Sequence, residues 1–146
     1  MIKVCTTKIS GKNVRSFLFL VFAVFALLSC EIQDENVNDD ARDNIVGTWK
    51  CQEKDKTNTA INFEAVISKN SSDTTKIWVD NFSSLGQGIN VSVGMDGYLL
   101  TIARQTVDGN IIQGSASISS SYETINWTYS IDDGAGKENY TAVYTR

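Results

Sequence analysis

The sequence predicts an all-β protein whose eight antiparallel strands run in up-and-down order and close into a small barrel. From Asn44 onward, apolar and polar residues alternate with a period of two, which is typical of strands with one buried face. Turn-forming residues interrupt the alternation at intervals of about 8–14 positions. No gap between the strands is long enough for the helix of a parallel crossover, so consecutive strands are expected to pair.

The eight expected strands share this alternation and are separated by Gly, Asp, Asn and Ser. They cover residues 45–52, 59–69, 75–81, 88–93, 98–104, 111–119, 122–131 and 138–145. Two of the turns contain Asp-Gly pairs, at Asp96 and Asp108, which tolerate the positive φ of tight hairpins. Closure of the sheet would remove the exposed strand edges that invite aggregation.

The apolar positions of the strands define a candidate core. These positions are Ile61, Phe63, Ala65, Ile67, Ile89, Val91, Val93, Tyr98, Leu100, Ile102, Ile112, Gly114, Ala116, Ile118, Ile125, Trp127, Tyr129, Ile131, Tyr140, Ala142 and Tyr144. Trp78 lies between Ile77 and Val79, which occupy the opposite face, so it is either exposed or part of a strand buried on both faces; the core position is favoured.

The first 29 residues have the organisation of a secretory signal. Four basic residues precede an apolar run over residues 17–28, which is shorter than the ~20 residues that a membrane-spanning helix needs. The following Leu27-Leu28-Ser29-Cys30 resembles a bacterial lipobox. The resemblance implies that residues 1–29 are removed and that Cys30 is acylated. The alternative is an ordinary signal peptide with a chance cysteine.

Residues 30–43 are expected to be a disordered tether that begins with the lipidated Cys30. This segment is rich in Asp and Glu and too poor in apolar residues to offset its chain entropy. Loss of residues 1–29 removes four basic residues and no acidic one, which changes the net charge from −4 to −8. Such a charge argues against nucleic acid as a partner. The acidic run also resembles a surface-export signal of Bacteroidetes lipoproteins, and a plain spacer is the open alternative.

The domain over residues 44–146 resembles the lipocalins and their calycin relatives. Its first strand contains Gly47-Thr48-Trp49, and its last strand ends at Arg146. In those families the tryptophan closes one end of the barrel and an arginine packs across it, so the resemblance implies a structural plug of Trp49 and Arg146. The overall plan is most similar to small lipocalin-like lipoproteins of Bacteroidetes, some of them described as lipid-binding.

The residue inventory offers no catalytic constellation, and we expect no enzyme activity, cofactor or metal. The chain has no histidine, which excludes Ser-His-Asp and Cys-His catalysis and His-ligated metals. Removal of Cys5 and lipidation of Cys30 leave Cys51 without a partner, and we expect it to be a buried strand thiol. Asp132 and Asp133 could bind calcium, but a solvated turn is favoured because further oxygen ligands are not in register.

Two functions remain open for a protein anchored in the cell envelope, with the outer membrane as its expected location. The first is a monomeric carrier of a small hydrophobic molecule or lipid. Its expected ligand-lining residues are Phe63, Ala65, Leu100, Ala116, Trp127, Tyr129 and Tyr144. The second is a filled barrel that presents its surface to a partner protein or glycan. The volume left inside the barrel distinguishes them.

The anchor can be tested by the substitution Cys30→Ala. This change should abolish acylation and release the protein from membranes, since one or more acyl chains would be its attachment. Fractionation of cells that produce the variant provides the measurement. A variant that still sediments with the membrane fraction would show that the lipobox hypothesis is wrong.

Overall fold

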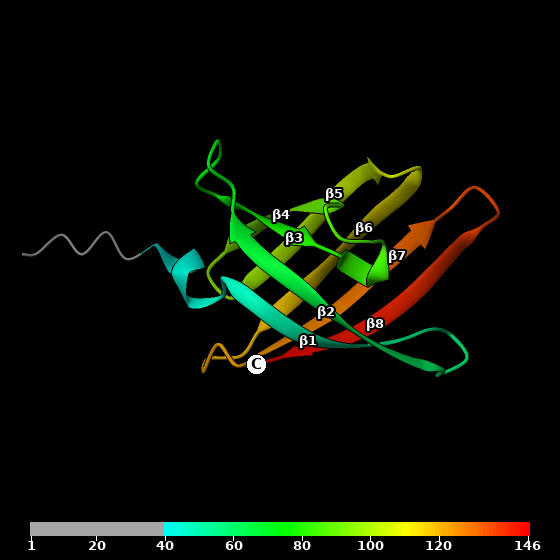
Figure 1. Ribbon diagram of the computed structural model, residues 1–146, viewed down its shortest axis with the longest axis horizontal. Coiled ribbons are helices and arrows are strands. Elements are labelled where there is room, and N and C mark those ends of the chain that lie inside the picture. The colour runs from blue at the N-terminus through cyan, green and yellow to red at the C-terminus, as the bar shows by residue number, and fades with distance from the viewer. Residues whose placement is uncertain (1–39) are drawn as a thin grey trace, which may run out of the picture. The chain divides into compact units, whose positions relative to one another are not determined.

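The computed structural model describes residues 40–146, which form one closed antiparallel barrel (Figure 1). Its strands are β1 (Gly47–Lys54), β2 (Ala60–Lys69), β3 (Lys76–Asp80), β4 (Asn90–Asp96), β5 (Leu99–Val107), β6 (Asn110–Ile118), β7 (Thr124–Asp132) and β8 (Lys137–Thr145). Each strand pairs with the next, and β8 pairs with β1. The predicted fold class is therefore confirmed, and the strand ends differ from the predicted ones by three residues or fewer. The predicted signal peptide, Cys30 and most of the tether lie outside the described residues.

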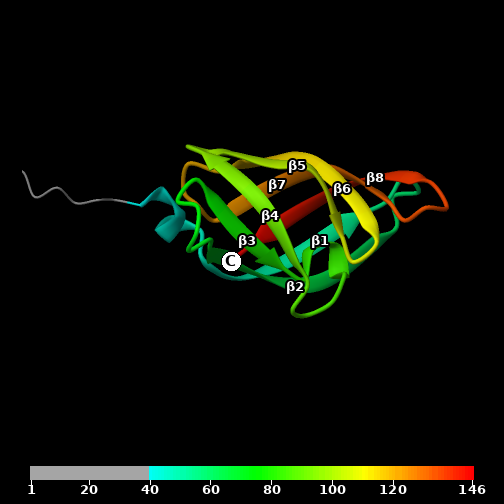
Figure 2. The same ribbon diagram turned by 90° about the horizontal axis from the view of Figure 1, so that it is seen from above.

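Residues 40–146 also contain two short 3-10 helices, η2 (Ala41–Asn44) before β1 and η3 (Phe82–Ser84) between β3 and β4. Both views show η2 at one end of the barrel and the β1–β2 and β7–β8 loops at the other (Figures 1 and 2). Within residues 40–146, no helix is both long and apolar enough to cross a membrane.

The alternation predicted from sequence places most of the expected core inside the barrel. Trp127, Tyr129 and Tyr144 all expose 2% or less of their surface. Two expected core residues are instead exposed: Ile61 at 45% and Tyr98 at 48%. Ile61 lies next to the first residue of β2, and Tyr98 lies in the β4–β5 turn, so neither position is enclosed by neighbouring strands.

Trp78 also differs from the favoured prediction. It lies on the outer face of β3 and is half-buried, while its neighbours Ile77 and Val79 are fully buried inside. The strand is thus buried on one face, as the period-two pattern requires, and the size of the tryptophan does not override that pattern.

Residues 40–43, which the sequence assigned to the tether, contact the β2–β3 connection of the barrel. Arg42 is 7% exposed, and its Nη1 donates to the carbonyl oxygens of Asn70, Asp73 and Lys76 in the β2–β3 connection, at 3.0–3.2 Å. Its Nη2 pairs with the Asp40 carboxylate at 2.7 Å. Residues 40–43 were expected to be disordered because of their acidity; the one arginine among them instead ties this segment to the β2–β3 connection. The carbonyl groups of Asp73 and Lys76 also accept backbone N–H bonds, so Arg42 is a second donor to them.

Trp49 seals the end of the barrel near η2. Its side chain is fully buried and its Nε1 donates to the Ile45 carbonyl oxygen at 2.9 Å. The guanidinium carbon of Arg146 lies 4.4 Å from the centroid of the ring, which is cation–π geometry. Arg146 Nη2 also donates to the carbonyl oxygens of Asn44 and Val46, at 2.8 and 3.3 Å. The structure therefore brings together the two residues that the lipocalin resemblance implied as a plug.

The pairing of β4 with β5 has the fewest register pairs in the barrel, and a side chain extends it. β4 and β5 share only three register pairs, from Gly94–Thr101 to Asp96–Leu99. Further along, the Gln105 amide donates to the Ser92 carbonyl oxygen at 2.6 Å and accepts from the Ser92 N–H at 3.1 Å. Gln105 follows an irregularity in the β5–β6 register, and its amide takes the place of a backbone partner.

The contribution of η2 can be tested by truncation. Residues 40–146 contain every strand pairing and the whole buried core, so this segment should unfold cooperatively. A chain of residues 44–146, or the variant Arg42→Ala, should melt several degrees lower because the three hydrogen bonds from Arg42 to the β2–β3 connection are lost. Since Arg42 holds the pKa of Asp40 below its ordinary value, the stability that Asp40 adds is present at neutral pH and is lost as the pH falls through the acidic range. Identical melting curves for the two chain lengths would contradict this role.

The seal can be tested by comparing two tryptophans. Trp49→Ala should reduce the free energy of unfolding by about 3–5 kcal/mol, as for other large-to-small aromatic changes in cores. Trp78→Ala is the matched control on the outer face and should cause less than half of that loss. Denaturant unfolding of both variants provides the measurement, and equal losses would contradict the assignment of Trp49 as the core plug.

Candidate functional site

A pocket of about 360 Å³ opens at the end of the barrel opposite Trp49, and we call it the mouth. Its lining residues come from the β1–β2 and β7–β8 loops, which lie at the right of Figure 1, and the strand ends beside them, from the start of β6 and from the η3 region. Its lining is Glu53, Asp55, Thr59, Ile61, Ser83, Leu85, Asn110, Ile131, Asp133, Gly136, Glu138 and Tyr140. The mouth thus combines aliphatic side chains with four carboxylates.

Glu53 forms the buried polar part of the mouth. It follows Trp49 and Cys51 on the inward face of β1 and is only 3% exposed. Its Oε2 accepts hydrogen bonds from the Tyr129 hydroxyl and from Ser83 Oγ, the latter at 2.6 Å. No hydrogen bond from the described residues reaches its Oε1, and no Lys or Arg in residues 40–146 forms an ion pair with it.

Two tyrosines near Glu53 remain protonated. Burial, with the negative charge of Glu53 adding to it, raises the pKa of Tyr129 far above its ordinary value. Burial, together with the hydrogen bond that its hydroxyl donates to Glu138, raises the pKa of Tyr140 to about 12. The rings of Tyr129 and Tyr140 stack with centroids 5.6 Å apart. Tyr129 is therefore a neutral hydrogen-bond donor to Glu53. Tyr140, whose ring stacks on that of Tyr129, belongs to the lining of the mouth.

The connection between β3 and β4 carries backbone strain beside Glu53. Asn81, Ser83 and Ser84 have φ values of 56°, 53° and 57°, in the left-handed region that side-chain-bearing residues rarely adopt. The Asn81 side chain holds the loop by bonds to the Glu64 carbonyl oxygen and the Gly86 N–H. Ser83 is held by its bond to Glu53. Such strain persists where surrounding contacts enforce it, and it often occurs at functional sites.

Phe82 closes the barrel interior beneath the mouth. It is fully buried, and its ring centroid lies 5.3 Å from that of Trp127 and 4.6 Å from that of Tyr129. Trp127 in turn packs against Tyr144 at 5.8 Å. Aromatic rings therefore occupy the interior between the mouth and the Trp49 seal.

The residues expected to line a ligand cavity mostly belong to this packed interior. Ala65, Leu100, Ala116, Trp127, Tyr129 and Tyr144 are all buried core residues, and Phe63 packs edge-on against Tyr144. Tyr129 is linked to the mouth through its hydroxyl. Two buried polar atoms of the interior, Trp127 Nε1 and the Tyr144 hydroxyl, have no hydrogen-bond partner among the described residues.

The other candidate reactive residues are Cys51, Asp132 and Asp133, and each has a structural role. Burial raises the pKa of the Cys51 thiol to about 12, so the thiolate needed for nucleophilic attack does not form at neutral pH. Asp132 and Asp133 each accept a backbone N–H two residues ahead, from Gly134 and Ala135. Residues 40–146 contain no group of three or more Cys, Asp or Glu side chains placed to hold a metal ion.

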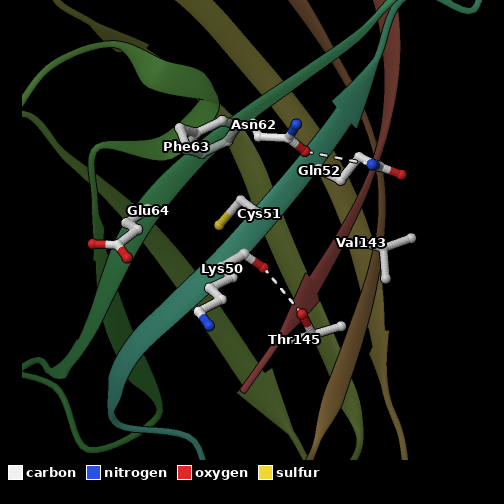
Figure 3. Close-up of a pocket in the computed structure, with 8 residues that line it drawn as sticks. All are labelled: Lys50, Cys51, Gln52, Asn62, Phe63, Glu64, Val143 and Thr145. Carbon is white, nitrogen blue, oxygen red and sulfur yellow. Dashed lines mark hydrogen bonds between the residues drawn. The ribbon is translucent and has the colours of Figure 1, made fainter.

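A second hollow, of about 600 Å³, lies on the outer face of β1, β2 and β8, and we call it the outer groove (Figure 3). It is lined by Lys50, Cys51, Gln52, Asn62, Phe63, Glu64, Val143 and Thr145. Most of these side chains are exposed, and Gln52 donates to Asn62 across the strands at 3.4 Å. Unlike the mouth, the outer groove contains no buried ionisable oxygen.

Sequence reasoning missed the central residues of the mouth. The strict alternation of Trp49, Cys51 and Glu53 was a usable signal, since it places the carboxylate of Glu53 on the same inward face as the plug. The inward position of Phe82 and the bond from Ser83 had no such signal, because both belong to a loop without periodicity.

Comparison with known proteins supports the fold alone. No protein-family model matches the chain, and no curated protein matches it. Among solved structures, the redesigned β-barrel b11L5F_LGL is similar with a TM-score of 0.53 and 14% identity, covering 73% of this chain and 95% of that one. EF1p2_mFAP2b bound to DFHBI is similar with a TM-score of 0.52 and 12% identity, covering 73% and 97%. The chain is thus a small closed antiparallel β-barrel.

Proposed function

We propose that this chain is a lipid-anchored envelope protein whose barrel binds a small, partly apolar molecule at the mouth. The observation that carries the proposal is a pocket of about 360 Å³ with one buried carboxylate at its inner side and aliphatic side chains around it. Ligand sites are commonly concave, about 300–1,000 Å³ in volume, and mostly apolar with a few fixed polar groups. The solved barrel EF1p2_mFAP2b, which has a similar fold, is bound to DFHBI.

The packing favours a ligand site at the mouth rather than in a deep cavity like that of a lipid carrier. A ligand below Phe82 would have to displace Trp127 or Tyr129 from close contact, and close-packed interiors resist such displacement. The acidic lining, with Asp55, Asp133 and Glu138 around Glu53, is also unfavourable for the anionic head of a fatty acid. A neutral or cationic ligand fits these charges better.

Anchoring, location and family are parts of the same proposal. Cys30 carries the lipid. The barrel is monomeric and has no catalytic activity. The protein is a lipocalin-like lipoprotein of the outer membrane of a Bacteroidetes-type bacterium. The η2 helix, which precedes β1, lies at the end of the barrel opposite the β1–β2 and β7–β8 loops that surround the mouth (Figure 1). This arrangement would let a tethered barrel keep its mouth free of the attachment point.

The second candidate function is binding of a partner protein or glycan at the outer face. The outer groove favours it, because Val143 is 41% exposed there between polar side chains. The two candidates differ in which hollow holds a ligand, so substitutions in each hollow distinguish them.

The proposed function can be tested with Nile red, a neutral apolar dye, and residues 40–146. We expect saturable binding at micromolar concentration. Ile61→Asn in the mouth should weaken it at least about fivefold by removing apolar contact area. Val143→Asn in the outer groove is the matched control and should leave the affinity unchanged, since Ile61 and Val143 are 45% and 41% exposed and both lie on strands. Dye fluorescence gives the affinity.

Two results would contradict binding at the mouth. Sensitivity to Val143→Asn instead of Ile61→Asn would move the site to the outer groove. Absence of saturable binding up to ~100 μM, which corresponds to about −5.5 kcal/mol, would favour a protein or glycan partner.

A further inference from the structure

We propose that the mouth recognises its ligand through a primary ammonium group, which the Glu53 carboxylate binds at the inner end of the pocket. This inference rests on the proposed function and assigns the chemical class of the ligand. The ligand would be a small amine with an apolar body.

The buried carboxylate is only half satisfied by the protein. Tyr129 and Ser83 both donate to Oε2, whereas Oε1 receives no donor from residues 40–146. Although the residue is only 3% exposed, Oε1 is not among the fully buried polar atoms that lack a partner, so it keeps contact with the space of the mouth. A carboxylate removed from water is costly unless it is paired and hydrogen-bonded. A bound ammonium would supply both the missing donor and the missing positive charge.

The rest of the mouth suits the same ligand class. Asp133 and Glu138 add negative charge at the rim, and only Glu138 is paired there, with the exposed Lys56 at 2.8 Å. Carboxylates around a cleft raise the local concentration of cations. The ring of Tyr140 provides an aromatic face for a cation.

The apolar part of the ligand has its own contacts. Ile61, Leu85 and Ile131 line the mouth alongside the carboxylates. A volume of about 360 Å³ accommodates an aryl or short alkyl group attached to the ammonium. The position of Glu53 at the inner end means that the charged group would enter first.

The strained β3–β4 connection fixes the carboxylate in this orientation. Ser83 is held at φ 53° while its hydroxyl bonds Oε2, and Tyr129 bonds the same oxygen from β7. Both donors act on one oxygen, which leaves the other free. An orientation fixed in advance lowers the entropic cost of binding.

The test compares three matched probes on residues 40–146: 2-phenylethylamine, 2-phenylethanol and 3-phenylpropionate, measured by titration calorimetry and amide chemical shifts. The amine should bind at least about tenfold tighter than the alcohol, a difference of about 1.4 kcal/mol. The carboxylate should bind weakest. This order is measured on the unaltered domain, so it needs no variant to fold.

The variant Glu53→Gln assigns the preference to one side chain. It keeps the size of the side chain and an oxygen for Tyr129 and Ser83, and it should reduce affinity for the amine at least tenfold while changing affinity for the alcohol less than twofold. Glu64→Gln is the matched control: it makes the same charge change at an exposed position on the adjacent strand β2 and should change neither affinity. Thermal melts of each variant verify folding.

The outcomes separate the two proposals. Equal affinity for amine and alcohol, or a preference for the carboxylate, overturns ammonium recognition and leaves binding at the mouth intact. Failure of all three probes and of Nile red overturns binding at the mouth itself.

An ammonium group can arrive on a free amine or on an ethanolamine lipid headgroup. Flotation with vesicles of phosphatidylcholine alone and of phosphatidylcholine with phosphatidylethanolamine distinguishes the sources. Flotation only with the ethanolamine lipid, abolished by Glu53→Gln, assigns the ammonium to a lipid. Binding of 2-phenylethylamine without flotation assigns it to a free amine.

Discussion

The pairing of β8 with β1 is the constraint on which the rest of this molecule depends. It turns an open eight-stranded sheet into a barrel without free edges. It also brings Arg146 at the end of the chain over Trp49 in the first strand, although the two are far apart in sequence. β1 begins and β8 ends at the same end of the barrel, so the contact between Trp49 and Arg146 lies at that end. The opposite end retains the β1–β2 and β7–β8 loops, and these surround the mouth.

Closure of so small a barrel requires local departures from regular strands. A Cβ atom on Gly114 would lie 2.4 Å from Tyr129 Cβ and 2.6 Å from the Thr128 carbonyl oxygen, so only glycine permits β6 to approach β7 this closely. On the other side of β6, the register of β5 shifts between Ile102 and Gln105, and the Gln105 side chain completes the contact with β4. The register irregularity thus lies between β5 and β6, while β6–β7 and β7–β8 pair without interruption.

Period-two alternation was sufficient to predict the strands, their order and most of the core, because burial of one strand face repeats along the chain. It failed for residues near the ends of the strands or outside them. Ile61 and Tyr98 have the right alternation but lie near strand ends, where no neighbour covers them. Arg42 and Phe82 lie outside the strands, and their burial depends on partners distant in sequence. Glu53 continues the alternation of Trp49 and Cys51, but it lies one residue beyond the strand that was predicted over residues 45–52.

The polar interior at the mouth has a different physical character from the seal. At the Trp49 end, burial, hydrogen bonding and the cation–π contact all stabilise the folded state. At the mouth, Glu53 is nearly buried with no Lys or Arg of residues 40–146 paired to it, and Ser83 adopts a disfavoured backbone conformation while it bonds Glu53. An apolar side chain at position 53 would fill the same space without these costs, since well-packed hydrophobic residues often replace buried ionic groups with no loss of stability. Under the proposed ammonium recognition, a ligand that supplies a positive charge would offset the cost of this carboxylate.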